Sequence, residues 1–234
     1  GASNTAFGNQ ALLSNTTAAN NTAVGQSALL ANTTGTQNTA VGSLALDAAT
    51  EADNNTAIGY ASLTTATTGA DNVAVGRAAL NENTSGSSNT AIGKDALESN
   101  TTASNNTAVG KDALTANTTS SDNTGVGKDA LLIQTTQLGN TAIGFEAMKA
   151  ATTGLGRNVG VGYRANSGIN TGAANTAVGW SAGGSTTGNG NTVMGYITNP
   201  GAAAAENRIC IGYVVNGTAD NRVHLGSNGG HIYN

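Results

Sequence analysis

Few side chains of this sequence could carry out acid–base, nucleophilic or metal chemistry. The chain has two histidines, His224 and His231, both near its end, and one cysteine, Cys210. A catalytic nucleophile needs a base within reach and a group that orients that base, and this composition offers no such set. A lone cysteine makes neither an intrachain disulfide nor a cysteine-based zinc site, so we expect Cys210 to fill a small slot. The sequence therefore predicts a protein that is not an enzyme and has no cofactor.

Acidic residues recur at a fixed spacing, which raises the question of a metal site. The word KDAL occurs at residues 94–97, 111–114 and 128–131. Each aspartate sits beside a lysine, so neighbouring columns of opposite charge offset one another at the surface. Calcium-binding β-rolls use a glycine- and aspartate-rich nonapeptide, which this chain lacks. We therefore expect no metal site.

Most aromatic residues share one position, directly after a recurring glycine. Five of them follow at spacings of 16 to 18 residues: Phe145, Tyr163, Trp180, Tyr196 and Tyr213. The same position holds lysine or glutamine elsewhere, so we expect it to face solvent. Tyrosine and tryptophan rings suit the apolar faces of sugars, which makes this column a candidate glycan-binding strip. The alternative is a self-supporting stack of rings with no ligand.

The recurring glycine reveals the elements that must position these side chains. It falls at Gly8 and then at eight successive steps of seventeen residues, as far as Gly144. Five further steps of 18, 17, 16, 17 and 14 residues end at Gly226. A fixed period of this kind is typical of stacked repeats. We therefore predict about fourteen coils.

Each repeat has the composition of a β-solenoid coil. Each repeat contains one short segment of β-branched residues, together with several asparagines, threonines and glycines. It lacks the 3.6-residue apolar period of a helix. We predict an all-β, parallel β-solenoid whose coils contain two strands of four or five residues, with asparagine ladders between coils. The regular leucine positions end at Met148, which predicts a regular shaft at residues 1–153 and an irregular tip or neck at 154–234.

Three columns of side chains suggest how the coils pack. We expect the residue before the glycine, such as Val24, to be buried with Thr22, because alternate strand residues share a face. Leu29 belongs to a second apolar column that completes a narrow core. Ala23 would then lie on the other face of the strand. A column of alanine in place of larger polar residues indicates close packing against another copy of the chain around a shared axis.

Charge and hydropathy limit the partners of the chain. Its formal net charge is −4 with nine Lys and Arg residues, which is too few for a surface that neutralises a row of phosphates. No stretch approaches the ~18 apolar residues of a membrane span, and no charged and apolar leader opens the chain. We therefore expect no nucleic-acid partner and no membrane insertion.

The repeat words resemble those of known fibres. NTAVG, NTAIG and NVAVG, each followed by a small-residue turn and AL, resemble the heads of trimeric bacterial autotransporter adhesins and, still more, the repeat shafts of bacteriophage tail fibres. The resemblance implies a left-handed parallel β-roll with three chains side by side. The seventeen-residue period is longer than that common in adhesin heads, which favours the phage side.

The last coils carry a second resemblance. ENRICIGYVVNGTADNRVHLGSNGGHIYN looks like the end of fibres that precede an endosialidase-type intramolecular chaperone. Such chaperones cleave themselves away just after the fibre, which implies that Asn234 is a mature C-terminus.

These observations predict a homotrimeric structural fibre segment and adhesin. It would be extracellular, on a virion tail fibre or a cell surface, and would present a receptor-binding tip to a cell-surface polysaccharide. One alternative is a self-polymerising filament subunit, because Gly1 runs into the first coil without the polar cap that solenoid ends need. Another is an ice-binding solenoid, which the repeated NTT words suggest, although Ala49 and Ala66 interrupt that threonine column.

Overall fold

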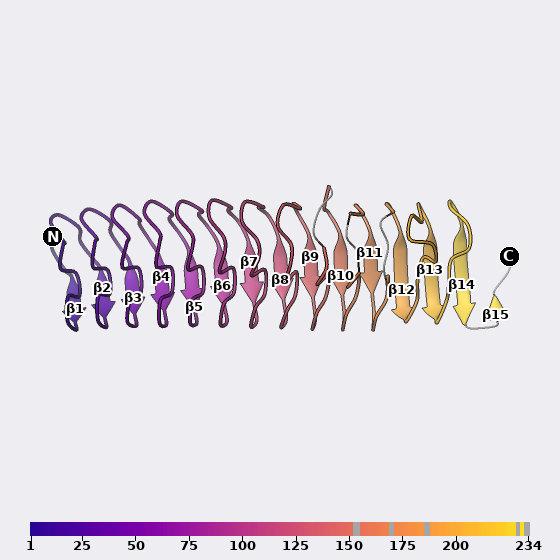
Figure 1. The fold of residues 1–234 in the computed structure, drawn as a ribbon, viewed down its shortest axis with the longest axis horizontal. Coiled ribbons are helices and arrows are strands. Elements are labelled where there is room, and N and C mark those ends of the chain that lie inside the picture. Colours follow the sequence, from indigo (N-terminus) through magenta and orange to yellow (C-terminus); the bar gives the residue numbers. More distant parts are fainter. Residues whose placement is uncertain (152–154, 169–170, 185–187, 228–229, 232–234) are drawn as a thin grey trace. The chain divides into compact units, whose positions relative to one another are not determined.

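The chain forms two compact units, Gly1–Ser121 and Asp122–Asn234, which are considered separately. The computed structural model (Figure 1) describes residues 1–151, 155–168, 171–184, 188–227 and 230–231. The predicted boundary between residues 153 and 154 lies outside these residues, so it stays a prediction.

The first unit is a stack of coils with one short strand each. Its strands are β1 (Thr5–Phe7), β2 (Thr22–Val24), β3 (Thr39–Val41), β4 (Thr56–Ile58), β5 (Val73–Val75), β6 (Thr90–Ile92) and β7 (Thr107–Val109). Successive strands pair in parallel and in register, so that Ala23 lies opposite Ala40 and Ala40 opposite Ala57. Equivalent residues of the repeat therefore lie one above another.

The second unit continues the same plan, with changes towards its end. Its strands are β8 (Thr124–Val126), β9 (Thr141–Ile143), β10 (Val159–Val161), β11 (Thr176–Val178), β12 (Thr192–Tyr196), β13 (Ile209–Tyr213), β14 (Val223–Ser227) and β15 (Gly230–His231). Strands β8 to β14 pair in parallel. β15 returns antiparallel to β14. The strands lengthen from three to five residues at β12.

The predicted fold class is confirmed: the chain is an all-β parallel solenoid with a seventeen-residue repeat and about fourteen coils. The described residues contain no helix, and hence none long and apolar enough to cross a membrane. The prediction that each coil contains a second strand is wrong. The leucine segment bonds to the next coil, as from the N–H of Leu63 to the carbonyl of Ala79. However, Ala61 and Leu63 both have a φ of 51°, and this left-handed backbone curls the segment out of a strand.

The prediction of which strand face points inward is also wrong. The middle alanine of the strand is buried, as at Ala57, whereas Ile58 beside it is 40% exposed. Leu63 is fully buried, so the core consists of alanine opposed by leucine. The expectation that the alanine column packs against another copy of the chain is therefore wrong, because these alanines are already buried within their own chain. The alanine face points inward because the coil is narrow: the space that faces each leucine holds no side chain larger than alanine. Threonine and valine or isoleucine do share a face, as strand alternation requires, but that face is the outer one.

The predicted asparagine ladder is present beside the core. The N–H of Asn72 donates to Oδ1 of Asn55 at 3.0 Å, and the N–H of Asn89 donates to Oδ1 of Asn72 at 3.0 Å. Nδ2 of Asn72 donates to the carbonyl of Gly86 at 2.9 Å. Each buried amide thus joins its coil to both neighbouring coils, which satisfies backbone groups that would otherwise be buried without partners.

Candidate functional site

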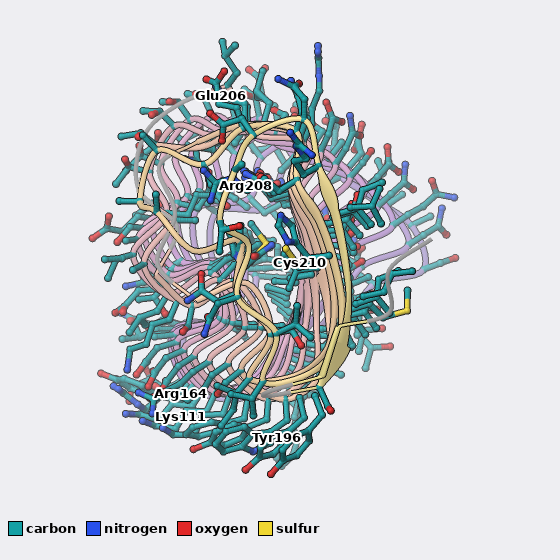
Figure 2. The ribbon with its side chains drawn as sticks, turned by 90° about the vertical axis from the view of Figure 1, so that its right-hand side faces the viewer. Lys111, Arg164, Tyr196, Glu206, Arg208 and Cys210 are labelled. Atoms are coloured by element: carbon teal, nitrogen blue, oxygen red, sulfur yellow. The ribbon has the colours of Figure 1, made fainter. Side chains whose placement is uncertain are left out.

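The candidate site is the column of aromatic side chains in the second unit. Each ring follows a glycine with positive φ, such as Gly162 at 130°. A Cβ built on Gly162 would overlap the carbonyl oxygen of Gly179 in the next coil. Glycine is therefore required here both by the backbone conformation and by the close approach of the coils. The residue after it projects outward, as Figure 2 shows for Tyr196.

The structure brings all five predicted residues together in one ladder. The ring centroids from Phe145 to Tyr213 are separated in turn by 5.2, 5.5, 4.9 and 5.1 Å. The angles between successive ring planes are only 6 to 15°. The residues are 37 to 57% exposed, so the prediction that this position faces solvent is confirmed. We call this column the aromatic ladder.

The stacking limits the chemistry that the ladder can offer. Tyr163, Trp180 and Tyr196 each have a ring neighbour on both faces. Separations near 5 Å are those of rings in contact, so a sugar cannot enter between two rungs. The interior rungs present ring edges and polar atoms to solvent instead. Whether the ladder binds a glycan stays a prediction.

Charged side chains surround the first rung. Nζ of Lys128 lies 5.2 Å from the ring centroid of Phe145, within the range of a cation–π interaction. Lys128 also pairs with Asp129 at 2.6 Å, while Glu146 pairs with Lys149 and with Arg164, each at 2.8 Å. The hydrogen bond from Lys149 lowers the pKa of the Glu146 carboxyl. The cluster thus contains three cations and two carboxylates, and the ammonium group of Lys128 covers the first ring of the ladder.

The adjacent lysine and aspartate of each KDAL motif form a salt bridge, in line with the opposite charges predicted for these two columns. Nζ of Lys94 lies 2.9 Å from Asp95, and Nζ of Lys111 lies 2.6 Å from Asp112. Asp95 additionally accepts from Arg77 of the preceding coil at 3.0 Å. Among the described residues, no three His, Cys, Asp or Glu side chains lie close enough to hold a metal ion.

Of the other reactive residues, Cys210 and His224 have described side chains. Cys210 is fully buried on the inner face of β13, which confirms the expected small slot, and burial raises the pKa of its thiol. Nε2 of His224 accepts a hydrogen bond from the N–H of Thr218 at 3.4 Å. The side chain of His231 lies outside the described residues.

Arg208 is a residue that sequence reasoning missed. It occupies the position of the ladder asparagines, and its N–H donates to Oδ1 of Asn191. Its guanidinium is buried and donates to the carbonyls of Pro200 at 2.6 Å and Gly217 at 3.2 Å and to the Asp220 carboxylate. The available signal was its place directly before β13, where earlier coils have asparagine. Arg208 replaces the amide ladder with an ion pair near the end of the stack.

A second surface of interest is the outer strip, which we define as the first and third residues of strands β1 to β7 in one unit and β8 to β14 in the other. These positions hold Thr, Val, Ile, Phe, Met and Leu and no charged residue. Several large apolar members are exposed: Phe7, Ile58, Ile92, Ile143, Met194, Ile209, Ile211 and Val223. Exposed apolar surface of this regularity indicates an interaction site.

Comparisons with protein-family models, curated proteins and solved structures gave no significant match to this chain.

Proposed function

We propose that the chain is a structural segment of a homotrimeric extracellular fibre that presents a carbohydrate-binding tip to a cell surface. The observation that supports this most is the uncharged outer strip. A solvent-exposed strand face normally carries polar and charged side chains, whereas this one offers Ile58, Ile92 and Ile143. Packing equivalent strips against one another around an axis would remove them from water.

The number three comes from the resemblance to phage tail-fibre shafts and adhesin heads. In such an arrangement the aromatic ladder of each copy would lie away from the shared axis, because its rings stand at the end of each strand or just after it, at the corner of the coil where Figure 2 shows Tyr196. Three identical weak sites would then act together, so that avidity replaces the strength of a single site. The location on a virion tail fibre or a cell surface is part of this proposal.

Light scattering of the purified chain tests the proposal. We expect three times the chain mass of 22.8 kDa, in a complex that survives SDS without boiling because paired backbone on both sides of each coil slows unfolding. A stable single-chain mass would overturn the trimer. Long fibres in negative-stain images would favour a self-polymerising filament subunit instead.

One observation favours a second candidate function, ice binding. Thr22, Thr39 and Thr56 lie on the outer face in register, one strand apart. The expected place of this column inside the core is therefore wrong. A flat, uncharged array of threonine and valine is the kind of surface that an ice-binding solenoid presents. A single-chain mass with thermal hysteresis would support this function over the fibre.

A further inference from the structure

The two ends of the aromatic ladder differ. At the Phe145 end, the ammonium group of Lys128 lies over the ring. At the other end, the register places Ser227 of β14 opposite Tyr213 of β13, where a sixth ring would continue the ladder. Tyr213 is 57% exposed, the largest fraction among the five rungs. The ladder therefore ends on an aromatic side chain followed by a small one.

Among the described residues, this end of the ladder has a ring face with no aromatic neighbour. Within the described part of the chain, Tyr213 stacks with one ring only, that of Tyr196. Neighbouring strands lie about 4.8 Å apart, so a ring held over Tyr213 would occupy the space beside the short side chain of Ser227. Among the described residues, the side chain at that position is the short one of serine, which adds a hydroxyl that can donate or accept a hydrogen bond.

We infer that the terminal face of Tyr213, beside Ser227, is the sugar-binding subsite of the ladder and that it takes a pyranoside with an uninterrupted C–H face, such as a β-galactoside. The sugar ring occupies the position that a sixth aromatic ring of the ladder would take. Its C–H face contacts the tyrosine ring, as sugars do on aromatic side chains, and its hydroxyls face Ser227 and solvent. This inference rests on the proposed function, since it names the ligand class of the same tip.

Saturation-transfer NMR with methyl β-galactoside tests the subsite on the full chain, with galactitol as the ring-free control. We expect the wild type to bind the galactoside and not the polyol. Tyr213→Ala should weaken binding at least about fivefold, given that an aromatic stacking contact contributes ~1 kcal/mol or more. Ser227→Trp should have the same effect with Tyr213 still present, because the new ring covers the open face.

Two control variants separate this geometry from others. Tyr60→Ala removes an exposed tyrosine that occupies the same repeat position in the first unit, outside the ladder, and should bind within about twofold of the wild type. Tyr163→Phe removes a hydroxyl from an interior rung and should also leave binding unchanged. Far-UV circular dichroism of every variant checks the fold. Loss of binding in Tyr163→Phe would mean that the ligand lies along the ring edges, which would overturn the inference.

The failure of this inference is distinct from the failure of the proposed function. Wild-type-like galactoside binding by Tyr213→Ala, or no binding by the wild type, would overturn the subsite. If a bacterial surface polysaccharide still binds to the trimer and is lost in Trp180→Ala, the proposed function would stand without it. A single-chain mass would overturn the trimer whatever the result at Tyr213.

Discussion

At the scale of single residues, the buried asparagines hold successive coils together through specific hydrogen bonds. Oδ1 of Asn72 is the acceptor for the backbone N–H of Asn89, while its Nδ2 donates to the carbonyl of Gly86. The carbonyl of Gly86 also accepts a hydrogen bond from Nδ2 of Asn83, which would remain if Asn72 were replaced. The group that depends on Asn72 alone is therefore the buried N–H of Asn89.

Asn72→Ala should lower the free energy of unfolding by about 1–3 kcal/mol, the cost of one buried and unsatisfied polar group. Urea denaturation would measure it. Asn81→Ala is the matched control, because Asn81 lies in the same unit and is only half-buried. Equal losses in the two variants would contradict the importance of the ladder.

Asp220 couples the end of the stack to pH. Its carboxylate accepts from the N–H of Glu206 at 3.0 Å and from Arg208 at 2.7 and 2.8 Å. The backbone hydrogen bond from Glu206 and then the Arg208 guanidinium lower the pKa of Asp220. A lowered native pKa means that this interaction stabilises the fold in full above the unfolded value of about 3.9 and is lost as the pH falls further.

Thermal unfolding followed between about pH 7 and pH 2 should show this dependence. We expect Asp220→Asn to unfold at a lower temperature than the wild type at neutral pH, and the two Tm curves to converge at the acid end. Carboxylates common to both proteins cancel in the difference. A constant Tm difference at all pH values would show that the Asp220 charge does not act in this way.

At the scale of elements, the size of each inward strand residue is matched to the side chain across the coil. β10 carries Gly160 where most strands carry alanine, and the preceding coil carries Met148 where most carry leucine. A Cβ built on Gly160 would lie 2.8 Å from Cγ of Met148 and 3.0 Å from the carbonyl oxygen of Ala165. The larger and the smaller residue thus compensate for each other.

A double-mutant cycle measures this compensation. Gly160→Ala should destabilise the fold by about 1–3 kcal/mol through overpacking. Adding Met148→Leu should recover part of that loss, because it recreates the leucine and alanine pair of other coils, such as the fully buried Leu131 and Ala142. The expected coupling energy is about 1 kcal/mol. Strictly additive effects in urea denaturation would refute direct packing between the two sites.

At the scale of the whole molecule, the outer strip decides whether the chain is single or assembled. Charges placed there should prevent assembly, because equivalent residues of three copies would meet near the shared axis and be desolvated. The test variant carries lysine at three exposed isoleucines: Ile58→Lys, Ile92→Lys and Ile143→Lys. We expect its mass by light scattering to fall from three chains to one.

The matched control carries the same charge on exposed threonines outside the strands: Thr68→Lys, Thr102→Lys and Thr136→Lys. It should remain assembled. Surface substitutions of this kind change stability by about 0.5 kcal/mol or less each, so both variants should keep the far-UV spectrum of the wild type. An assembled strip variant would place the interface elsewhere on the coils.

The period, the parallel stacking and the column in which each residue lies could all be predicted from the order of the amino acids. A seventeen-residue repeat places equivalent residues in equivalent environments. Repeats that contain a short β-branched segment and a following glycine do this by stacking their coils in register. The aromatic column could be found in the same way, since Phe145 and Tyr213 occupy one position of the repeat.

The direction in which each column faces and the contacts of the rings depend on the folded coil and could not be predicted from the repeat. Strand alternation states that threonine and valine share a face, but it does not say which face, because that depends on the width of a closed coil. By analogy with Met148 and Gly160, the space opposite Leu63 accommodates Ala74 and no larger side chain, so the larger residues turn outward. Likewise, the spacing of the aromatic residues left open whether the rings stack on one another, and the structure shows that they do, from Phe145 to Tyr213.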